Sequence, residues 1–401
     1  MSISDAVILI PGFLGFGQIG HFSYFANRVG AALRGCLLGL SDADIPVIPV
    51  KTAPTKPLAD RQLTLLHILK EIDRRYRSLR RLHLVGHSTG GVDAYLLTGQ
   101  SPLQRGTSWE ALDPDRVRHK ISTVTTIASP HAGTCLALSP LARFFRHPLF
   151  EIHKSPSLAI ALWQLARSLE VDEMALGALA GALVDTGETA AYALDVFWAR
   201  TLVDDLQPRH LVKVQNQTNK ELKDTQLRCV VTMAGRRTRN YRRRNRKIGL
   251  REPDAFFRTM YSYTAGSGFD EAYDDPERIT QAINQIEMAI SAGKLIGNAN
   301  SELRRITPEL NDGLVNSARQ LVNPTSEEEL LAVVVGDHID VMGYYPRWVT
   351  AWQGSSAQEQ KQLRSGILHS GSGFGDEQFF ALFQQIAKSI VSQVQCRGDE
   401  K

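Results

Sequence analysis

The chain of 401 residues lacks a long hydrophobic run, and its N-terminus lacks the pattern expected of a leader. Its longest uninterrupted apolar stretch, from Met174 to Val184, has 11 residues, whereas a helix needs about 20 apolar residues to cross a membrane. The residues before the first apolar stretch include Asp5 but no Lys or Arg. A secretory signal peptide begins with a positively charged region, so the N-terminus does not resemble one. We therefore expect no transmembrane segment, and a protein that is cytoplasmic or is exported without an N-terminal signal.

Cysteine is also scarce. The four cysteines, Cys36, Cys135, Cys229 and Cys396, lie far apart in the sequence and form no C-x-x-C pair. Disulfide frameworks and structural zinc sites use closely spaced or regularly patterned cysteines. The spacing therefore favours reduced, mostly buried thiols over a zinc site or a disulfide scaffold.

The excess of positive charge comes from one segment. Arg236–Arg251, called here the basic segment, holds nine basic residues and no acidic one, and without it the net charge of +4 becomes negative. A solvated surface loop is one interpretation of such a run. Contact with an anionic membrane surface is another, because each basic residue near such lipid contributes about 1 kcal/mol. Nucleic acid is not expected as a partner, since the rest of the chain is acidic.

Short β-branched runs alternate with amphipathic stretches along the chain. This alternation predicts an α/β fold with a mostly parallel sheet that is covered by helices on both faces. The expected strands are Ala6–Ile10, Ile45–Val50, Leu82–Val85, Ile121–Ala128, Arg228–Ala234, Phe257–Ala265 and Leu330–Val335. One helix is expected from Pro57 onward, and others at Val92–Leu97, Ile279–Ile290 and Glu377–Val394.

The pattern changes between Thr134 and Gln226, where the sequence is rich in Ala and Leu and has helical periodicity without obvious strands. We predict that residues 1–133 and 227–401 form the α/β core, and that residues 134–226 form a helical cap or lid over one end of the sheet. A mobile lid that opens on lipid and a fixed cap over a small pocket both fit this composition.

The strongest chemical signal is Gly86-His87-Ser88-Thr89-Gly90-Gly91, which lies between an expected strand and an expected helix. A serine that projects from such a sharp turn needs neighbours with little or no side chain two positions away, and glycine occupies both. At the start of the helix, backbone N–H groups and the helix dipole favour a developing oxyanion. Ser88 is therefore the candidate nucleophile, and His87 is interpreted as a packing residue rather than a second base.

A nucleophilic serine needs a base and a carboxylate that orients the base. His338 follows the strand expected at Leu330–Val335, which places it at the carboxyl edge of the sheet, where parallel sheets gather their active sites. Asp312 lies in an expected turn before it, and we choose it as the acid. Asp337 and Asp340 compete for this role, but they lie too close to His338 in sequence to reach its Nδ1 readily.

An oxyanion hole needs two N–H donors, one from the residue after the nucleophile and one from an early loop. Thr89 is the first candidate donor. The second is the backbone N–H of Phe13, in the Pro11-Gly12-Phe13-Leu14-Gly15 loop that follows the first expected strand.

Taken together, these motifs resemble the bacterial triacylglycerol lipases and esterases of the α/β-hydrolase fold. The resemblance rests on five short segments that occur in the right order: Ile8–Phe16, Gly86–Gly91, Val124–Gly133, Asn311–Val315 and Asp337–Asp340. It implies Ser88, Asp312 and His338 as a catalytic triad, and Phe13 and Thr89 as oxyanion donors. It also implies that residues 134–226 correspond to the lid of those lipases.

The chain departs from that family at the position of Pro11 and at one of the two calcium aspartates. Pro11 stands where those lipases usually carry a histidine. Asp340 matches an aspartate that holds a structural calcium ion in many of them, and the resemblance therefore implies a calcium ion there. A turn cap is the other interpretation of Asp340. The second calcium aspartate has no counterpart, because no aspartate occurs between Asp275 and Asp312.

The sequence thus predicts a serine carboxylic-ester hydrolase that acts through an acyl-enzyme on lipid-like esters and requires no cofactor. A phospholipase, a thioesterase or an acyltransferase would use the same residues. A membrane-binding or partner-binding protein without catalysis is the alternative from another class. The sequence indicates no particular acyl chain length or oligomeric state.

Overall fold

A computed structural model describes the greater part of the chain. The described residues are 3–12, 18–19, 22–23, 25–53, 55–139, 142, 200–218, 225–235, 255–266, 275–297, 303, 305–322, 329–345 and 369–396. The basic segment and Phe13 lie outside them, as does most of the predicted cap.

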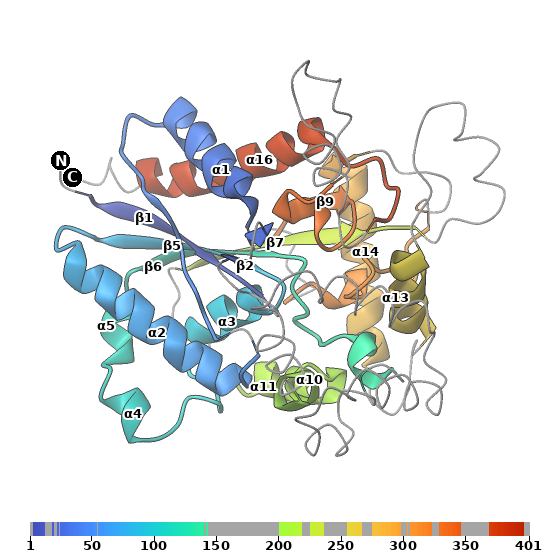
Figure 1. The fold of residues 1–401 in the computed structure, drawn as a ribbon, viewed down its shortest axis with the longest axis horizontal. Helices are drawn as coiled ribbons and strands as arrows, with labels where there is room; N and C mark the ends of the chain where they lie inside the picture. Colours follow the sequence, from blue (N-terminus) through green and yellow to red (C-terminus); the bar gives the residue numbers. More distant parts are fainter. Residues whose placement is uncertain are drawn as a thin grey trace.

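A seven-stranded sheet forms the centre of the molecule (Figure 1). Its strands lie in the order β4 (Val47–Pro49), β1 (Asp5–Ile10), β5 (Arg81–His87), β6 (Ile121–Ile127), β7 (Gln226–Met233), β9 (Leu330–Val335) and β8 (Leu295–Ile296). Every neighbouring pair is parallel. The short strands β2 (Gln18–Ile19) and β3 (Phe22–Ser23) form a separate antiparallel pair.

Helices cover both faces of this sheet (Figure 1). One face carries α1 (Ala26–Leu40) and α16 (Asp376–Cys396). The other carries α2 (Leu58–Arg75), α3 (Thr89–Leu97), α4 (Thr107–Glu110), α5 (Pro114–Arg118) and α14 (Pro276–Ser291). The predicted α/β architecture with a parallel sheet is therefore confirmed.

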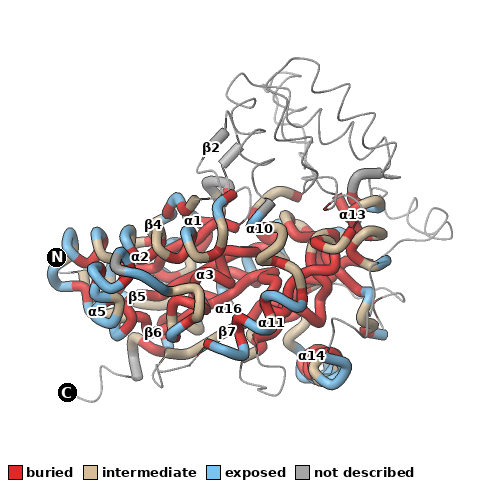
Figure 2. Tube along the Cα trace, turned by 90° about the horizontal axis from the view of Figure 1, so that it is seen from below, coloured by how far each residue is buried: buried red, intermediate tan, exposed pale blue. Residues whose placement is uncertain are grey.

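Strand β1 shows why the sheet is buried on both sides. Successive side chains of a strand point to opposite faces. Accordingly, Val7 and Leu9 join the apolar core under α1 and α16, while Ile8 and Ile10 join the core under α2 and α3. An uninterrupted apolar run is typical of such a doubly covered strand, and Figure 2 shows buried residues along the central strands.

The strand predicted at Phe257–Ala265 is wrong, because this stretch forms the helix α13 (Ala255–Gly266). Phe257, Met260, Tyr261 and Thr264 are buried among the residues of α13 whose burial is described. Their spacing is that of one helical face rather than of alternate strand positions. Aromatic and β-branched residues suggested a strand, and the packing of this face overrides that local preference.

The end of the predicted cap is helical where it is described. It contains α10 (Arg200–Asp205) and α11 (Pro208–Asn216), and the short 3-10 helix η1 (Cys135–Leu138) lies at its beginning. Leu202 and Leu211 are fully buried in the apolar core beside α3 and α14. Residues 143–199 lie outside the described part of the chain, so the cap and the domain division remain predictions.

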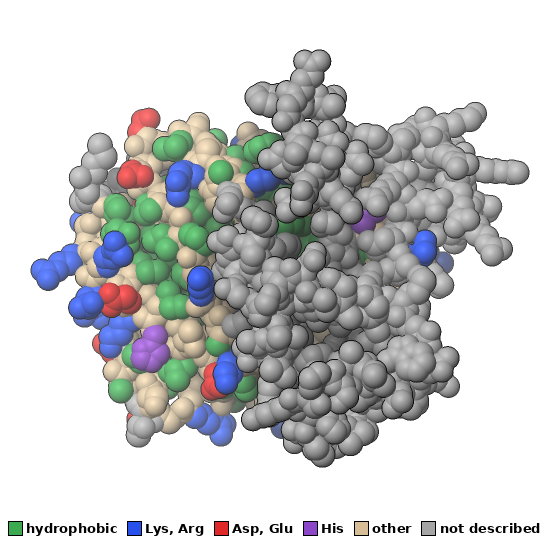
Figure 3. Space-filling model, viewed as in Figure 1, with side chains coloured by type: hydrophobic (Ala, Val, Ile, Leu, Met, Phe, Trp, Pro, Cys, Tyr) green, Lys and Arg blue, Asp and Glu red, His purple; other side chains and the backbone are tan. Residues whose placement is uncertain are grey.

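The described surface is mixed in character. On the face drawn in Figure 3, a group of hydrophobic side chains is bordered by Lys and Arg side chains. Across the part of the chain that the structure describes, no helix is both long and apolar enough to cross a membrane.

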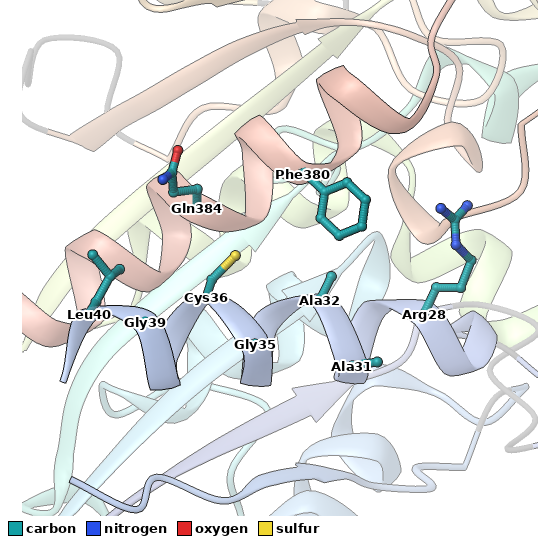
Figure 4. A pocket seen from close by; sticks show the side chains of 9 residues that line it. All are labelled: Arg28, Ala31, Ala32, Gly35, Cys36, Gly39, Leu40, Phe380 and Gln384. Carbon is teal, nitrogen blue, oxygen red and sulfur yellow. The ribbon is translucent and has the colours of Figure 1, made fainter. Parts of the chain in front are cut away.

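An open groove of about 520 Å³ runs between α1 and α16 (Figure 4). Small residues of α1, among them Gly35 and Gly39, form one side, and the half-exposed Phe380 of α16 forms part of the other. Arg28, the charged residue that lines it, is paired with Asp376 at 2.7 Å. The groove thus offers an apolar surface whose lining charge is already neutralised.

Candidate active site

Ser88 lies in a strained turn between β5 and α3. Its φ of 55° falls in the left-handed region, which costs a residue other than glycine roughly 1–3 kcal/mol. The turn is tied to the next strand, because the Ser88 N–H donates to the carbonyl oxygen of Ile127 at 2.9 Å. Such a strained turn lifts the serine side chain out of the line of the strand at the carboxyl edge of the sheet.

Close backbone packing around this turn explains its glycines. A methyl group at Gly86 would overlap the carbonyl of Gly90, and one at Gly90 would overlap the carbonyl oxygens of Ile10 and Pro11. The turn, the start of α3 and the loop after β1 are therefore in van der Waals contact. Only glycine permits this approach.

His338 and Asp312 meet at the same edge of the sheet. The Nδ1 of His338 lies 2.8 Å from Oδ2 of Asp312, and the His338 N–H donates to the Asp312 carbonyl oxygen at 3.0 Å. Both side chains are buried, with Asp312 fully enclosed. The structure therefore joins the two residues that the sequence selects as base and acid.

Two further polar side chains hold Asp312, and sequence reasoning missed both. The hydroxyl of Thr232, in β7, donates to Oδ2 of Asp312 at 2.6 Å, and the Gln320 amide donates to the same oxygen at 3.3 Å. The other oxygen, Oδ1, accepts the backbone N–H groups of Leu314 and Val315. The carboxylate is thus fixed in one orientation toward His338.

The rival carboxyls point elsewhere. Asp337 accepts the backbone N–H groups of Ile339, Asp340 and Ser370. Asp340 accepts the N–H of Asp337 and the hydroxyl of Ser372. Burial raises the pKa of Asp337 to about 7. Burial, together with the charge of Asp337, also raises the pKa of Asp340. The Nδ1 of the His338 ring donates its hydrogen bond to Asp312.

Asp340 is also the residue at which calcium is predicted. Calcium takes six to eight oxygen ligands. Within the described ranges, no three His, Cys, Asp or Glu side chains gather into a group that would hold a metal, and Asp340 already accepts the two hydrogen bonds given above. These residues alone do not make a calcium site. The ion remains a prediction, and no step below depends on it.

His87 connects the serine turn to the histidine loop. Its Nε2 lies 2.8 Å from the carbonyl oxygen of His338, and the two rings lie 4.7 Å apart. A carbonyl oxygen only accepts, so Nε2 of His87 carries a proton. Burial and the neighbouring His338 hold the pKa of His87 well below its ordinary value. His87 is therefore a hydrogen-bond donor to the histidine loop as well as a packing residue.

The two predicted oxyanion donors differ in what the structure describes. Thr89 begins α3, where backbone N–H groups have no partner inside the helix. Phe13 lies outside the described residues, but the loop that leads to it is held in place. Arg61 donates to the carbonyl oxygen of Pro11 at 3.0 Å and forms a fully buried ion pair with Asp93 of α3. The start of the early loop is thus fastened to the helix that follows the serine.

Comparison with known proteins gives a distant structural likeness. No family model and no curated protein matches the chain. Similar solved structures include the Staphylococcus hyicus lipase, at 14% identity over 98% of this chain and 97% of that chain, with a TM-score of 0.46. EstA from Clostridium botulinum is 16% identical over 85% of this chain and 84% of its own, with a TM-score of 0.45.

A metagenomic carboxyl esterase is 14% identical over 98% of this chain and 78% of its own, with a TM-score of 0.43. These neighbours are lipases and esterases, the group that the sequence motifs resemble. At such identities and TM-scores, however, they do not assign an activity to this chain.

Proposed function

We propose that this protein is a serine carboxylic-ester hydrolase that acts through an acyl-enzyme on lipid-like esters. The observation that carries the proposal is the 2.8 Å contact between His338 Nδ1 and Asp312 Oδ2 at the edge of the sheet where Ser88 occupies its strained turn. A serine, an imidazole and a buried carboxylate in this chain order form a nucleophile, a base and the group that orients the base.

Asp312 determines which ring nitrogen acts. Because its carboxylate accepts the Nδ1 proton of His338, Nε2 is left with its lone pair as the base. Nε2 takes the proton of the Ser88 hydroxyl as the oxygen attacks the ester carbonyl. Asp312 then stabilises the imidazolium that forms.

The carbonyl oxygen becomes negatively charged in the tetrahedral intermediate. The backbone N–H groups of Thr89 and Phe13 bind it, and the loss of one such donor lowers kcat by about 10²–10³-fold. When the intermediate collapses, the bond to the alcohol breaks and His338 returns its proton to the departing oxygen. Water, activated by the same nitrogen, then releases the acid from Ser88 and restores the enzyme.

The first test is hydrolysis of p-nitrophenyl esters from acetate to palmitate, with the wild type beside Ser88→Ala. We expect Ser88→Ala to lower kcat by about 10⁶-fold, because the nucleophile is lost, and to leave the melting temperature within a few degrees. Ser122→Ala is the matched control. Ser122 is also buried, and its hydroxyl has no hydrogen-bond partner within the described residues, so this variant keeps its activity.

The chain-length profile separates the remaining alternatives. Serine-dependent release that increases with chain length indicates a lipase, and release confined to short chains indicates an esterase under a fixed cap. Activity that survives in Ser88→Ala contradicts the nucleophile assignment. If the wild type releases no product, phospholipid, thioester and acyl-transfer substrates are tested next, since they use the same residues.

A further inference from the structure

His87 joins two loops that are 251 residues apart in sequence. It is the last residue of β5, where it pairs with Ile127 of β6, and Ser88 follows it directly. Its side chain, only 1% exposed, reaches the carbonyl oxygen of His338. The backbone that carries the nucleophile is therefore connected to the backbone that carries the base by one buried hydrogen bond.

The backbone N–H and the Nδ1 of His338 are both held by Asp312. Its N–H donates to the Asp312 carbonyl oxygen, and its Nδ1 lies against the Asp312 carboxylate. Asp312 thus orients the ring but provides no link to the serine turn. Within the described residues, the hydrogen bond from His87 directly relates the position of His338 to that of Ser88.

We propose that His87 is a positioning residue, whose Nε2–H sets the distance between the Ser88 hydroxyl and the His338 ring. This inference rests on the proposed function. His87 donates its proton to a carbonyl and takes no part in proton transfer. Misplacing a reacting group by about 1 Å costs roughly 10²-fold in rate, so the loss of this donor slows the chemical step more than it weakens substrate binding.

The experiment compares His87→Phe, which keeps a ring of similar size but has no donor, with His87→Gln, whose amide nitrogen reaches a similar position. We expect His87→Phe to lower kcat by about 100-fold with KM changed less than about twofold, the pattern of an interaction needed in the transition state. His87→Gln recovers kcat to within about fivefold of the wild type.

A second readout is the rate at which a fluorophosphonate labels Ser88, which requires no ester substrate. In this reaction the serine oxygen bonds to phosphorus, fluoride leaves, and His338 takes the serine proton. We expect the labelling rate of His87→Phe to fall in parallel with its kcat. His83→Phe is the matched control, because His83 is a fully buried histidine earlier in β5 that contacts Thr123 and Asp5. We expect His83→Phe to have a lower melting temperature and an unchanged kcat.

The outcomes distinguish the two proposals. If the wild type is labelled at Ser88 and His87→Phe is labelled equally fast, the proposed function stands and the role of His87 is wrong. If kcat falls as far in His87→Gln as in His87→Phe, restoring an N–H donor does not restore the rate, which also overturns the inference. If the wild type is neither labelled nor hydrolyses any ester, the proposed function itself fails. Should His87→Phe not fold, His87→Met, flexible and without an N–H donor, takes its place.

Discussion

At the scale of single residues, the assignment of Asp312 as the acid has two competing candidates, Asp337 and Asp340. Asp312→Asn keeps the size of the side chain but places an amide opposite His338, which favours the wrong ring tautomer. We expect kcat to fall by about 10⁴-fold with little change in melting temperature. Asp337→Asn is the control, because its carboxyl binds backbone N–H groups instead. A loss of this size in Asp337→Asn, with Asp312→Asn active, would reverse the assignment.

Asp5 makes the stability of the protein depend on pH. Burial alone would raise its pKa, but hydrogen bonds from His83 and Arg81 outweigh burial and hold the pKa well below its ordinary value. A carboxyl with a lowered pKa in the folded state stabilises the protein above the pKa of the unfolded chain, and this contribution disappears as the pH falls below about 4.

Asp5→Asn tests this directly. At pH 7 we expect the variant to lose roughly 3 kcal/mol of unfolding free energy, since one partner of a buried pair is removed. Below about pH 4 the difference from the wild type shrinks, because the Asp5 carboxyl of the unfolded wild-type chain then becomes protonated, which stabilises the unfolded state. Urea unfolding at a series of pH values measures both. A difference that stays constant down to pH 2 would refute this account.

At the scale of elements, two glycines should respond in opposite ways to the same substitution. Gly90→Ala places a methyl group against the carbonyl oxygens of Ile10 and Pro11, and we expect it to cost roughly 3 kcal/mol. Gly35→Ala, on the open side of α1, meets nothing within 4 Å and should add about 0.5–1 kcal/mol, because alanine favours a helix. Thermal unfolding of both variants measures whether each change in stability is positive or negative. A stabilised Gly90→Ala would contradict the close packing at the serine turn.

The elements also show which parts of the fold could be predicted from the sequence. Strands β1, β5, β6 and β9 were predictable because each is a continuous apolar or β-branched run between turn signals. Helix α1 escaped prediction since Gly30, Gly35 and Gly39 interrupt its pattern, and β8 has only two residues. In the site, the contact of Asp312 with His338 was predicted. The support from Thr232 and Gln320 was not, because it arises only when distant segments pack together.

At the scale of the whole molecule, charge is unevenly distributed. We expect the protein to bind vesicles that contain phosphatidylserine, and to bind less as salt screens the charges. A variant with Arg242, Arg243, Arg244 and Arg246 replaced by Gln should bind at least about tenfold more weakly in a vesicle sedimentation assay. The matched control replaces four exposed arginines in and after α2: Arg74, Arg75, Arg77 and Arg80. Equal weakening in both variants would show that net charge, rather than the basic segment, attracts the lipid.

The distance along the chain between the serine turn and the histidine loop has a consequence for synthesis and refolding. Parallel sheets depend on contacts between remote segments, and such contacts form late and slowly. Under the proposed function, the nucleophile leaves the ribosome long before its base, and the hydrogen bond between His87 and His338 spans 251 residues. A partly made chain therefore holds the nucleophile without its base, and a refolding chain regains helical content before it regains turnover. Catalytic activity thus reports that the last strands have joined the sheet.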